Sequence, residues 1–285
     1  MISLRSVTAK HGSGTAVSDA LQDREFAQFR DLIFRVAGIS MTPVKKPLVA
    51  GRLHKRLRHH GLNSYAEYLD MLDRSADEMQ IAIDLLTTNE THFFREPKHF
   101  EFLRQQLLPR HFAQESGRST LRIWSAASSS GQEAYSLAML LNDVAAQGQW
   151  EIFGSDISTR VLEQARAGVY HIDQAHEIPD PYLQTCCLRG VGSQAGNFAI
   201  DPVLKSRVAF AQINLNETLP DVGRFDVIFL RNVLIYFQPE TKRAVISRLL
   251  EKLRPGGHFI VGHSESLNGI APGLQTVAAS IYRKP

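Results

Sequence analysis

The order of apolar and polar positions divides the chain into two parts. Up to about residue 90, apolar residues recur at spacings of three and four, which is the pattern of one face of an α-helix. The first such series stops at Gly38 and consists of Phe26, Phe29, Ile33 and Phe34. Three more helices are predicted: one after Pro47, one over SYAEYLDMLDR and one from about Ala76 to Leu86. Because no strand pattern occurs before residue 85, we expect a small helical domain.

After about residue 100 the pattern changes to short apolar runs that alternate with helical segments. The runs are LRIWSAA, WEIFGSD, FDVIFLRN and HFIVGH, and patterns such as PETKRAVISRLLEKL lie between them. This alternation predicts an α/β fold, a doubly wound parallel sheet with helices on both faces. Between Tyr182 and Ile213 the segments CCLRGVGSQAGNFAI and RVAFAQIN predict short strands with glycine-rich turns, interpreted as an antiparallel insertion.

These patterns give a predicted domain organisation. We expect a flexible tail over 1–19, a helical domain over 20–75, a linker helix over 76–90 and the α/β domain over 91–285, with the inserted β-subdomain at about 182–212.

Composition excludes several classes of protein. The chain has 285 residues, 44% hydrophobic and 21% charged, and a net charge of +3, which alone does not indicate a nucleic-acid partner. Cys186 and Cys187 are adjacent, so we expect neither a disulfide framework, nor a redox role, nor a metal site. The sequence has neither the apolar core of a signal peptide nor a run long enough to span a bilayer. We therefore expect a cytoplasmic protein without membrane insertion.

In a doubly wound sheet, ligands bind at the carboxyl ends of the strands. The run LRIWSA is followed by a loop of small residues, Ala127 to Glu133, which allows the backbone to approach a ligand closely. Glu133 would repel a phosphate, so the loop favours a nucleoside without one. The alternative interpretation is a tight turn between strand and helix.

Asp156 and the pair Arg231–Asn232 follow two other strands. Asp156 is placed to accept hydrogen bonds from two ribose hydroxyls. Its alternative role is the N-cap of the next helix, although Ser158 can fill that role instead. Arg231 and Asn232 end the buried run FDVIFL, where unpaired polar groups are costly. A zwitterionic ligand would supply partners, and the alternative for Arg231 is a pair with a structural carboxylate.

Six segments together resemble the chemotaxis receptor methyltransferases, the CheR family. They are LTTNETHFFRE (86–96), IWSAASSSGQEAYSLA (123–138), SDIS (155–158), ARAGVY (165–170), FDVIFLRNVLIYF and GHSESL (262–267). The resemblance spans roughly residues 24 to 285. It implies a helical N-terminal domain, and an S-adenosylmethionine-dependent methyltransferase domain with an inserted β-subdomain. The implied activity is O-methylation of glutamates on chemoreceptor cytoplasmic helices. The alternatives are a methyltransferase with another acceptor and a non-catalytic S-adenosylmethionine-binding module.

The family's functional residues carry over onto matching positions of this sequence. The resemblance implies catalytic roles for Arg95 and Tyr236. The implied cofactor contacts are Asn89, Thr91, Arg95, Glu133, Asp156, Asn214, Leu215, Arg231 and Asn232. The chain departs from the family pattern at Gln132 and Ala134, where a second glutamate and a proline are usual, so either Gln132 or Glu133 faces the ligand.

A basic segment, VKKPLVAGRLHKRLRHH (44–60), predicts a docking surface. On a helix, Arg52, Lys55, Arg56 and His59 fall on one arc, which the resemblance assigns to the acidic receptor helices. The alternatives are a solvated basic face and a phosphate-binding surface; the latter ranks last because aromatic residues are not interleaved. The β-subdomain is a candidate site for a receptor C-terminal peptide. We expect a monomer.

Overall fold

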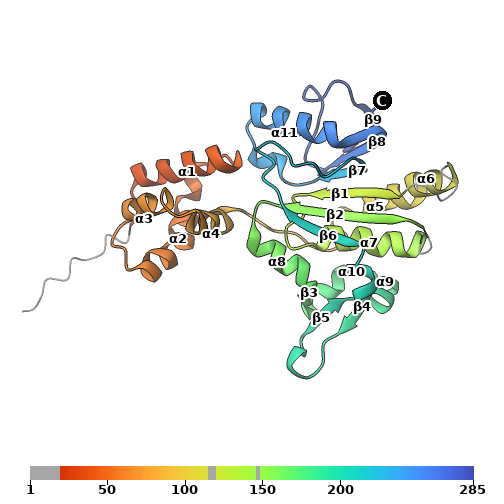
Figure 1. Ribbon diagram of the computed structural model, residues 1–285, viewed down its shortest axis with the longest axis horizontal. Coiled ribbons are helices and arrows are strands. Elements are labelled where there is room, and N and C mark those ends of the chain that lie inside the picture. The colour runs from red at the N-terminus through yellow and green to blue at the C-terminus, as the bar shows by residue number, and fades with distance from the viewer. Residues whose placement is uncertain (1–19, 115–119, 146–147) are drawn as a thin grey trace, which may run out of the picture.

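The computed structural model describes residues 20–114, 120–145 and 148–285. The expected tail over 1–19 therefore lies outside the described residues. A helical domain forms one end of the molecule and a larger domain built on a sheet forms the other (Figure 1). No helix within the described ranges is both long enough and apolar enough to cross a membrane.

Four helices form the helical domain: α1 (Asp23–Ala37), α2 (Lys46–His60), α3 (Tyr65–Leu72) and α4 (Ala76–Leu86), with a short 3-10 turn η1 (Pro43–Lys45) before α2. The predicted stop at Gly38 is confirmed, since this residue ends α1 in the left-handed conformation with φ of 71°. Ser64 and Ser75 cap α3 and α4 by accepting hydrogen bonds from backbone N–H groups.

The predicted linker helix belongs to this domain. The buried apolar side chains of α4, which are Ala82, Ile83 and Leu86, share one hydrophobic core with those of α1, α2 and α3. Residues 76–86 are therefore the fourth helix of the helical domain, and its amphipathic pattern served packing inside the domain.

The main sheet has seven strands in the order β6-β2-β1-β7-β8-β10-β9. The first five are parallel: β6 (Val208–Gln212), β2 (Trp150–Asp156), β1 (Leu121–Ala126), β7 (Phe225–Leu230) and β8 (Leu253–Val261). The antiparallel pair β10 (Ile281–Arg283) and β9 (Gln275–Ala278) closes one edge. The chain leaves β1 toward β2 on one side and returns to β7 on the other, so the strand order reverses between β1 and β7.

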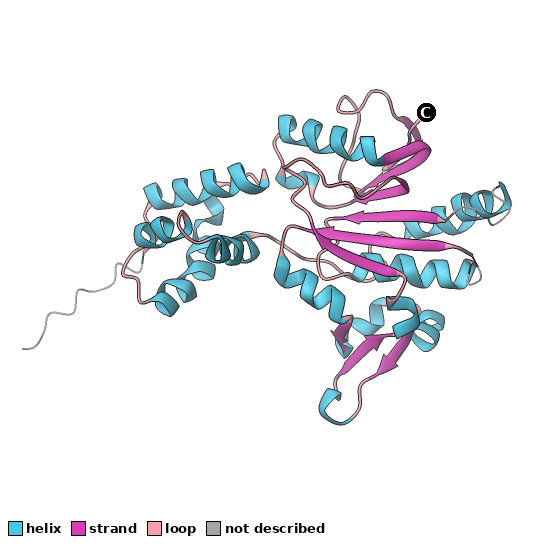
Figure 2. Ribbon diagram, in the orientation of Figure 1, coloured by secondary structure: helices cyan, strands magenta, loops and turns pink. Residues whose placement is uncertain are grey.

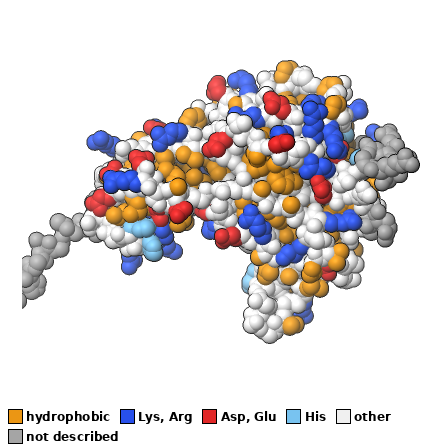
Figure 3. Space-filling model, viewed as in Figure 1, with side chains coloured by type: hydrophobic (Ala, Val, Ile, Leu, Met, Phe, Trp, Pro, Cys, Tyr) orange, Lys and Arg blue, Asp and Glu red, His pale blue; other side chains and the backbone are white. Residues whose placement is uncertain are grey.

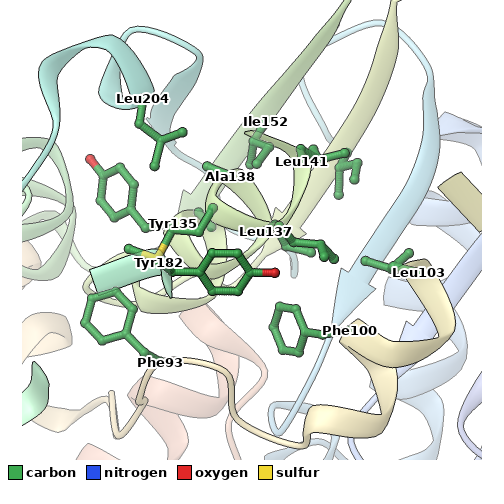
Figure 4. Close-up of a cluster of buried hydrophobic side chains, with 14 of the residues drawn as sticks. Phe93, Phe100, Leu103, Tyr135, Leu137, Ala138, Leu141, Ile152, Tyr182 and Leu204 are labelled. Carbon is green, nitrogen blue, oxygen red and sulfur yellow. The ribbon is translucent and has the colours of Figure 1, made fainter. Parts of the chain in front are cut away.

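Helices cover both faces of this sheet (Figure 2). They are α5 (Pro97–Phe102), the π-helical turn η2 (Leu103–Leu107), α6 (Leu108–Gln114), α7 (Gln132–Val144), α8 (Thr159–Ala167) and α11 (Pro239–Lys252). Successive residues of a strand point to opposite faces, and in β1 Ile123 enters one core while Trp124 enters the other. Figure 4 shows side chains of α5, α7 and β2 converging in the first of these cores. Apart from Asp226, which is half-buried, every residue of the run FDVIFL is buried, so this strand is covered on both faces as predicted.

A second, three-stranded antiparallel sheet projects from the main domain (Figure 1). Its strands are β3 (Val169–His171), β4 (Cys187–Arg189) and β5 (Asn197–Ile200). The connecting elements are η3 (Ile172–Glu177), α9 (Asp180–Cys186) and η4 (Gly192–Gln194), and α10 (Pro202–Lys205) follows.

This arrangement corrects the predicted bounds of the insertion, 182–212. The segment RVAFAQIN forms β6, which pairs in parallel with β2 in the main sheet, whereas β3 joins the small sheet from before residue 182. A short apolar run has the same pattern in either sheet, so only long-range pairing decides its place.

Candidate functional site

A pocket lies between the two domains, at the carboxyl ends of β1, β2 and β7. Domain interfaces and the point where strand order reverses are common positions for ligand sites. Every residue predicted to bind cofactor or to act in catalysis lines this pocket: Asn89, Thr91, Arg95, Glu133, Asp156, Asn214, Leu215, Arg231, Asn232 and Tyr236. The four predicted docking residues do not line it.

The helical domain supplies a wall of the pocket that sequence reasoning had missed. This wall consists of Ala37, Ile39, Ser40, Met41, Lys45 and Leu48. The backbone holds it in place: Ser40 N donates to Tyr236 O at 2.8 Å, and Ile39 forms an isolated antiparallel bridge with Phe237. Asn214 Nδ2 also donates to Val36 O at 2.8 Å. The wall joins the predicted site only through tertiary contact, so no local pattern could have indicated it.

The small-residue loop after β1 folds tightly over the end of β2. Ala127 N and Ser128 N both donate to Ser155 O, at 2.8 and 2.7 Å. Ala127 and Ser129 have positive φ values of 76° and 50°, which cost energy in residues other than glycine. Ser128 Oγ is buried beside the pocket and has no hydrogen-bond partner among the described residues. Strain and an unsatisfied hydroxyl indicate a site built to receive a ligand.

Gly131 lets the helix α7 start in this crowded position. It has φ of 94°, and a Cβ there would lie 3.0 Å from the Cβ of Ala165. After it the chain turns Glu133 toward the pocket, whereas Gln132 is buried and contacts Ser130 and Gln174. Of the two candidates left open by the sequence, Glu133 therefore faces the pocket.

Asp156 is held by the backbone at the end of β2. Its Oδ2 accepts from Ser129 N at 2.9 Å and its Oδ1 from Ser158 N at 3.0 Å. Ser158 caps α8, as the sequence suggested, so Asp156 is not the cap. Burial raises the pKa of Asp156, and the backbone N–H groups oppose that rise. A carboxylate has about four acceptor positions, so each oxygen keeps capacity for a ligand hydroxyl.

Arg231 is paired with two carboxylates. Its guanidinium contacts Glu133 Oε2 at 2.9 Å and Glu96 Oε2 at 3.0 Å, and it donates to Arg95 O. The Arg231 side chain is only 2% exposed. The structural-carboxylate alternative therefore describes this arginine in the structure, even though it lines the pocket. Glu133 also accepts from Ser125 Oγ at 2.7 Å.

Glu96 is the main site residue that sequence reasoning missed. It adopts φ of 60° and accepts hydrogen bonds from Arg231, from Asn232 Nδ2 at 3.2 Å and from His263 N at 3.1 Å. Burial by itself would raise the pKa of Glu96, but Arg231, Asn232 and His263 bring it below its usual value. The available signal was its place at the end of LTTNETHFFRE, next to Arg95.

Glu96, His99 and His263 are the one group of metal-ligand type within the described ranges, with ligand atoms within 4.8 Å of one another. His99 is 1% exposed, and burial followed by the charge of Arg231 lowers its pKa to about 3. Because both Glu96 oxygens already accept hydrogen bonds, a metal ion there would have to displace Arg231. The donor set fits an arginine with a neutral imidazole behind it better than a metal ion.

Arg95 and Tyr236 line the pocket, and each keeps polar capacity for a ligand. Arg95 is half-buried, and its Nη1 donates to Glu90 O at 3.3 Å. Throughout the part of the chain that the structure describes, its guanidinium has no carboxylate partner and the Tyr236 hydroxyl has no hydrogen bond. These two groups are therefore available to a substrate.

Two of the four predicted docking residues on α2 make contacts inside the helical domain. Arg52 Nη1 donates to Leu85 O and Thr87 O, each at 2.9 Å, and so satisfies carbonyls at the end of α4. Arg56 pairs with the buried Glu78 at 2.6 Å. Lys55 and His59 remain exposed. Neighbouring side chains on this arc of α2 therefore differ: Arg56 contacts α4, whereas Lys55 faces solvent. Helical periodicity alone placed both on one arc and could not separate them.

Two family models and several curated relatives match most of this chain. Residues 24–87 match the family model described as CheR methyltransferase, all-alpha domain, and residues 89–282 match CheR methyltransferase, SAM binding domain. A chemotaxis protein methyltransferase of Salmonella typhimurium is 38% identical over 268 residues, covering 92% of this chain and 91% of that protein. Chemotaxis protein methyltransferase 2 of Pseudomonas aeruginosa is 41% identical over 266 residues, covering 90% of this chain and 92% of that protein. The chemotaxis protein methyltransferase of Escherichia coli is 40% identical over 270 residues, with 92% and 91% covered.

Proposed function

Because the chain belongs to the CheR methyltransferase family, we propose that it methylates glutamate side chains on the cytoplasmic helices of chemoreceptors. It is an S-adenosylmethionine-dependent methyltransferase of chemotaxis. The observation that carries the choice of acceptor is the pair of free polar groups on Arg95 and Tyr236. They line the pocket that all the predicted cofactor residues share. A free guanidinium favours an anionic acceptor over a neutral one.

The pocket fits S-adenosylmethionine. Asp156 keeps acceptor capacity for ribose hydroxyls, and Ser128 Oγ lacks a partner among the described residues. The carboxylate of Glu133 would attract the ammonium group of the methionine part, and the buried Leu215 would lie beside the adenine together with Asn214. The loop of small residues after β1 leaves room for close approach of the backbone.

The bound cofactor supplies an electrophilic methyl group on its sulfonium. An acceptor glutamate has an ordinary pKa near 4.3, so it is ionised at neutral pH and needs no general base. His99, which lies beside Glu96, does not line the pocket, and burial lowers its pKa to about 3, which makes it a weak base. The protein therefore aligns the two reactants and excludes water, which favours a reaction that neutralises charge.

Arg95 and Tyr236 orient the acceptor. A bidentate pair with Arg95 would stabilise the carboxylate before reaction and reduce its nucleophilicity. We therefore assign Arg95 a contact with one carboxylate oxygen, which leaves the other oxygen free to attack. The Tyr236 hydroxyl donates a hydrogen bond that fixes the orientation of the carboxylate.

The exposed residues Lys55 and His59 support docking of an acidic receptor helix on α2, and the small sheet β3-β5-β4 is a candidate site for a receptor C-terminal peptide. The proposed protein is a cytoplasmic monomer that acts on membrane receptors. It neither inserts into the membrane nor binds nucleic acid. No metal ion has a part in it.

The test is a methyl-transfer assay with radiolabelled S-adenosylmethionine and membranes that carry receptors from the same cell. Four proteins are compared: the unmodified chain, Arg95→Ala, Tyr236→Phe and the control Arg243→Gln, which changes an exposed arginine on α11. Label should enter receptor protein and be released as methanol by mild base. We expect Arg95→Ala to lower the rate about 100-fold, by the scale of losing one transition-state contact, with cofactor affinity retained.

The possible failures are distinct. If the chain binds the cofactor but leaves receptors unlabelled, the acceptor assignment is wrong, and labelling of RNA or a small molecule would identify the alternative class. If no acceptor is methylated although the cofactor binds, the chain is a non-catalytic module. If Arg95→Ala and Arg243→Gln behave alike, Arg95 has no role in catalysis.

A further inference from the structure

A second cavity lies at the opposite end of the parallel strands from the cofactor pocket. It is a groove at the amino-terminal ends of β7 and β8, bounded by η2 and α6 on one side and by β9 and β10 on the other. Three segments far apart in the sequence contribute basic side chains to it: α6 with Arg110 and His111, β8 with His258, and β10 with Arg283. The proposed methyl transfer uses none of them.

The charge of this groove is not balanced by its own lining. Asp226 is its one lining carboxylate among the described residues. That carboxylate is already neutralised, because Arg254 Nη1 contacts both of its oxygens, at 2.6 and 2.7 Å, and Arg122 N donates to it at 2.8 Å. Arg110 has no ion pair within the described ranges, and the Arg283 guanidinium contacts only the carbonyl oxygen of Gly256, at 3.4 Å. Two arginine charges therefore face one cavity without a counter-ion.

The two histidines give independent support. His111 Nε2 is buried and has no hydrogen-bond partner in the part of the chain that the structure describes. His258 packs against Phe102 with ring centroids 5.8 Å apart. Burial, followed by the charges of Arg283 and Arg110, lowers the pKa of His258 to about 4. Arg110, His258 and Arg283 line the same cavity, so both arginine charges and the imidazole face one volume.

The backbone around the groove is shaped locally as well. The turn over Leu103–Leu107 is π-helical, and such turns occur often at functional sites. The pairing of β7 with β8 shifts register between Phe225 and Val227, beside Pro255 and Gly256. Gly256 has φ of 76°, and a Cβ there would stand 3.6 Å from the Arg283 guanidinium. A larger residue would therefore narrow the groove at its charged side. Figure 3 shows Lys and Arg side chains gathered on this end of the molecule, near β8 and β9.

We propose that this groove is a second ligand site, which binds a small phosphate-bearing molecule through Arg110, His258 and Arg283. Arginine recognises phosphate oxygens by paired N–H donors, and a multiply charged anion suits a cavity with two unbalanced cations. The exposed amides of Gln106 and Gln275 offer further polar contacts at its rim. The site is separate from methyl transfer, since β7 runs from this groove to Arg231 at the cofactor pocket.

The test uses inorganic pyrophosphate as the probe, at constant ionic strength so that general screening does not change. Binding is measured by calorimetry on the full chain and by the NMR titration of the His258 ring. We expect saturable binding, and a rise in the pKa of His258 toward its ordinary value as the anion offsets Arg110 and Arg283. Arg110→Gln and Arg283→Gln should each weaken binding at least tenfold. The matched control Arg243→Gln, on exposed α11, should not.

Two results would overturn the proposal. The first is that pyrophosphate does not bind, or that Arg243→Gln weakens its binding as much as Arg110→Gln does. The second is citrate, an anion of similar charge, binding as tightly as pyrophosphate, which would exclude recognition of phosphate. Binding of S-adenosylmethionine by each variant shows that it has folded, and the outcome does not depend on which acceptor is methylated.

Discussion

Replacing Arg231 by methionine distinguishes a structural arginine from one that binds the ligand. The side chain is 2% exposed and holds Glu96 at 3.0 Å and Glu133 at 2.9 Å. Methionine keeps most of the apolar stem but leaves two carboxylates near each other without a cation. Removing one partner from a buried ion pair costs about 3–5 kcal/mol.

The cost should lie near the lower end of that range, about 3 kcal/mol. Glu96 keeps its hydrogen bonds from Asn232 and His263 N, and Glu133 keeps the one from Ser125. Both carboxylates also retain some contact with solvent, at 14% and 13% exposure. For a domain of this size, 1 kcal/mol shifts Tm by about 2–4 °C, so the expected fall in Tm is about 6–12 °C.

Thermal unfolding is followed by circular dichroism at pH 7 and at pH 5, with urea unfolding as a second measure. The loss should be smaller at pH 5, because two unpaired carboxylates have raised pKa values and one of them takes up a proton more readily. The double variant Arg231→Met, Glu96→Gln should recover about 1 kcal/mol, since one stranded charge is removed. The control Arg243→Met, at a side chain 56% exposed, should change Tm by less than about 2 °C.

One result would refute this reasoning. If Arg231→Met unfolds within 2 °C of the unmodified chain but no longer binds S-adenosylmethionine, then Arg231 acts by contacting the ligand. Its ion pairs would then contribute little to stability.

Three further predictions concern other buried or exposed charges. Glu78 is 4% exposed, and although burial opposes it, hydrogen bonds from Arg56, Tyr68 and His60 lower its pKa to about 2. The ionised Glu78 carboxylate contributes about 3 kcal/mol to stability above pH 4.5, and this contribution is lost as the pH falls toward 2. The acid unfolding curve of Glu78→Gln should therefore be flatter than that of the unmodified chain between those values. Asp84 accepts hydrogen bonds across the domain interface from Thr159 N and Oγ1, at 3.0 and 2.8 Å. The variant Asp84→Ala should therefore lower the free energy of unfolding by about 1–2 kcal/mol. An unchanged midpoint of urea unfolding would contradict this. Lys55→Glu should slow receptor methylation at low salt without changing Tm, whereas Arg56→Gln should lower Tm, and the reverse pattern would restore Arg56 to the docking surface.

Much of this molecule follows from local pattern. Periodicities of 3.6 and 2, with Gly38 as a stop, gave the helices of the first domain and the alternation of strands and helices in the second. Ser158 was one of two candidate caps and the structure confirms it, since capping depends on a few adjacent residues. The motifs carrying the CheR resemblance indicated the family, which the comparisons bear out. These features depend on neighbours in the sequence, and that information is fully contained in it.

Partners far apart in the chain were decided only by the tertiary structure. Glu96 lies 135 positions from Arg231, and Glu78 lies 22 from Arg56, so no periodicity connects either pair. The same holds for β6, whose apolar run fits either sheet until β2 pairs with it. The sequence by itself therefore determined most of the elements and the residues that reach the pocket from the ends of the strands, but not the wall that the helical domain supplies. Which charges are free in that pocket, and which are bound to one another, depended on folding, because the cost of burying a charge is set by what lies beside it.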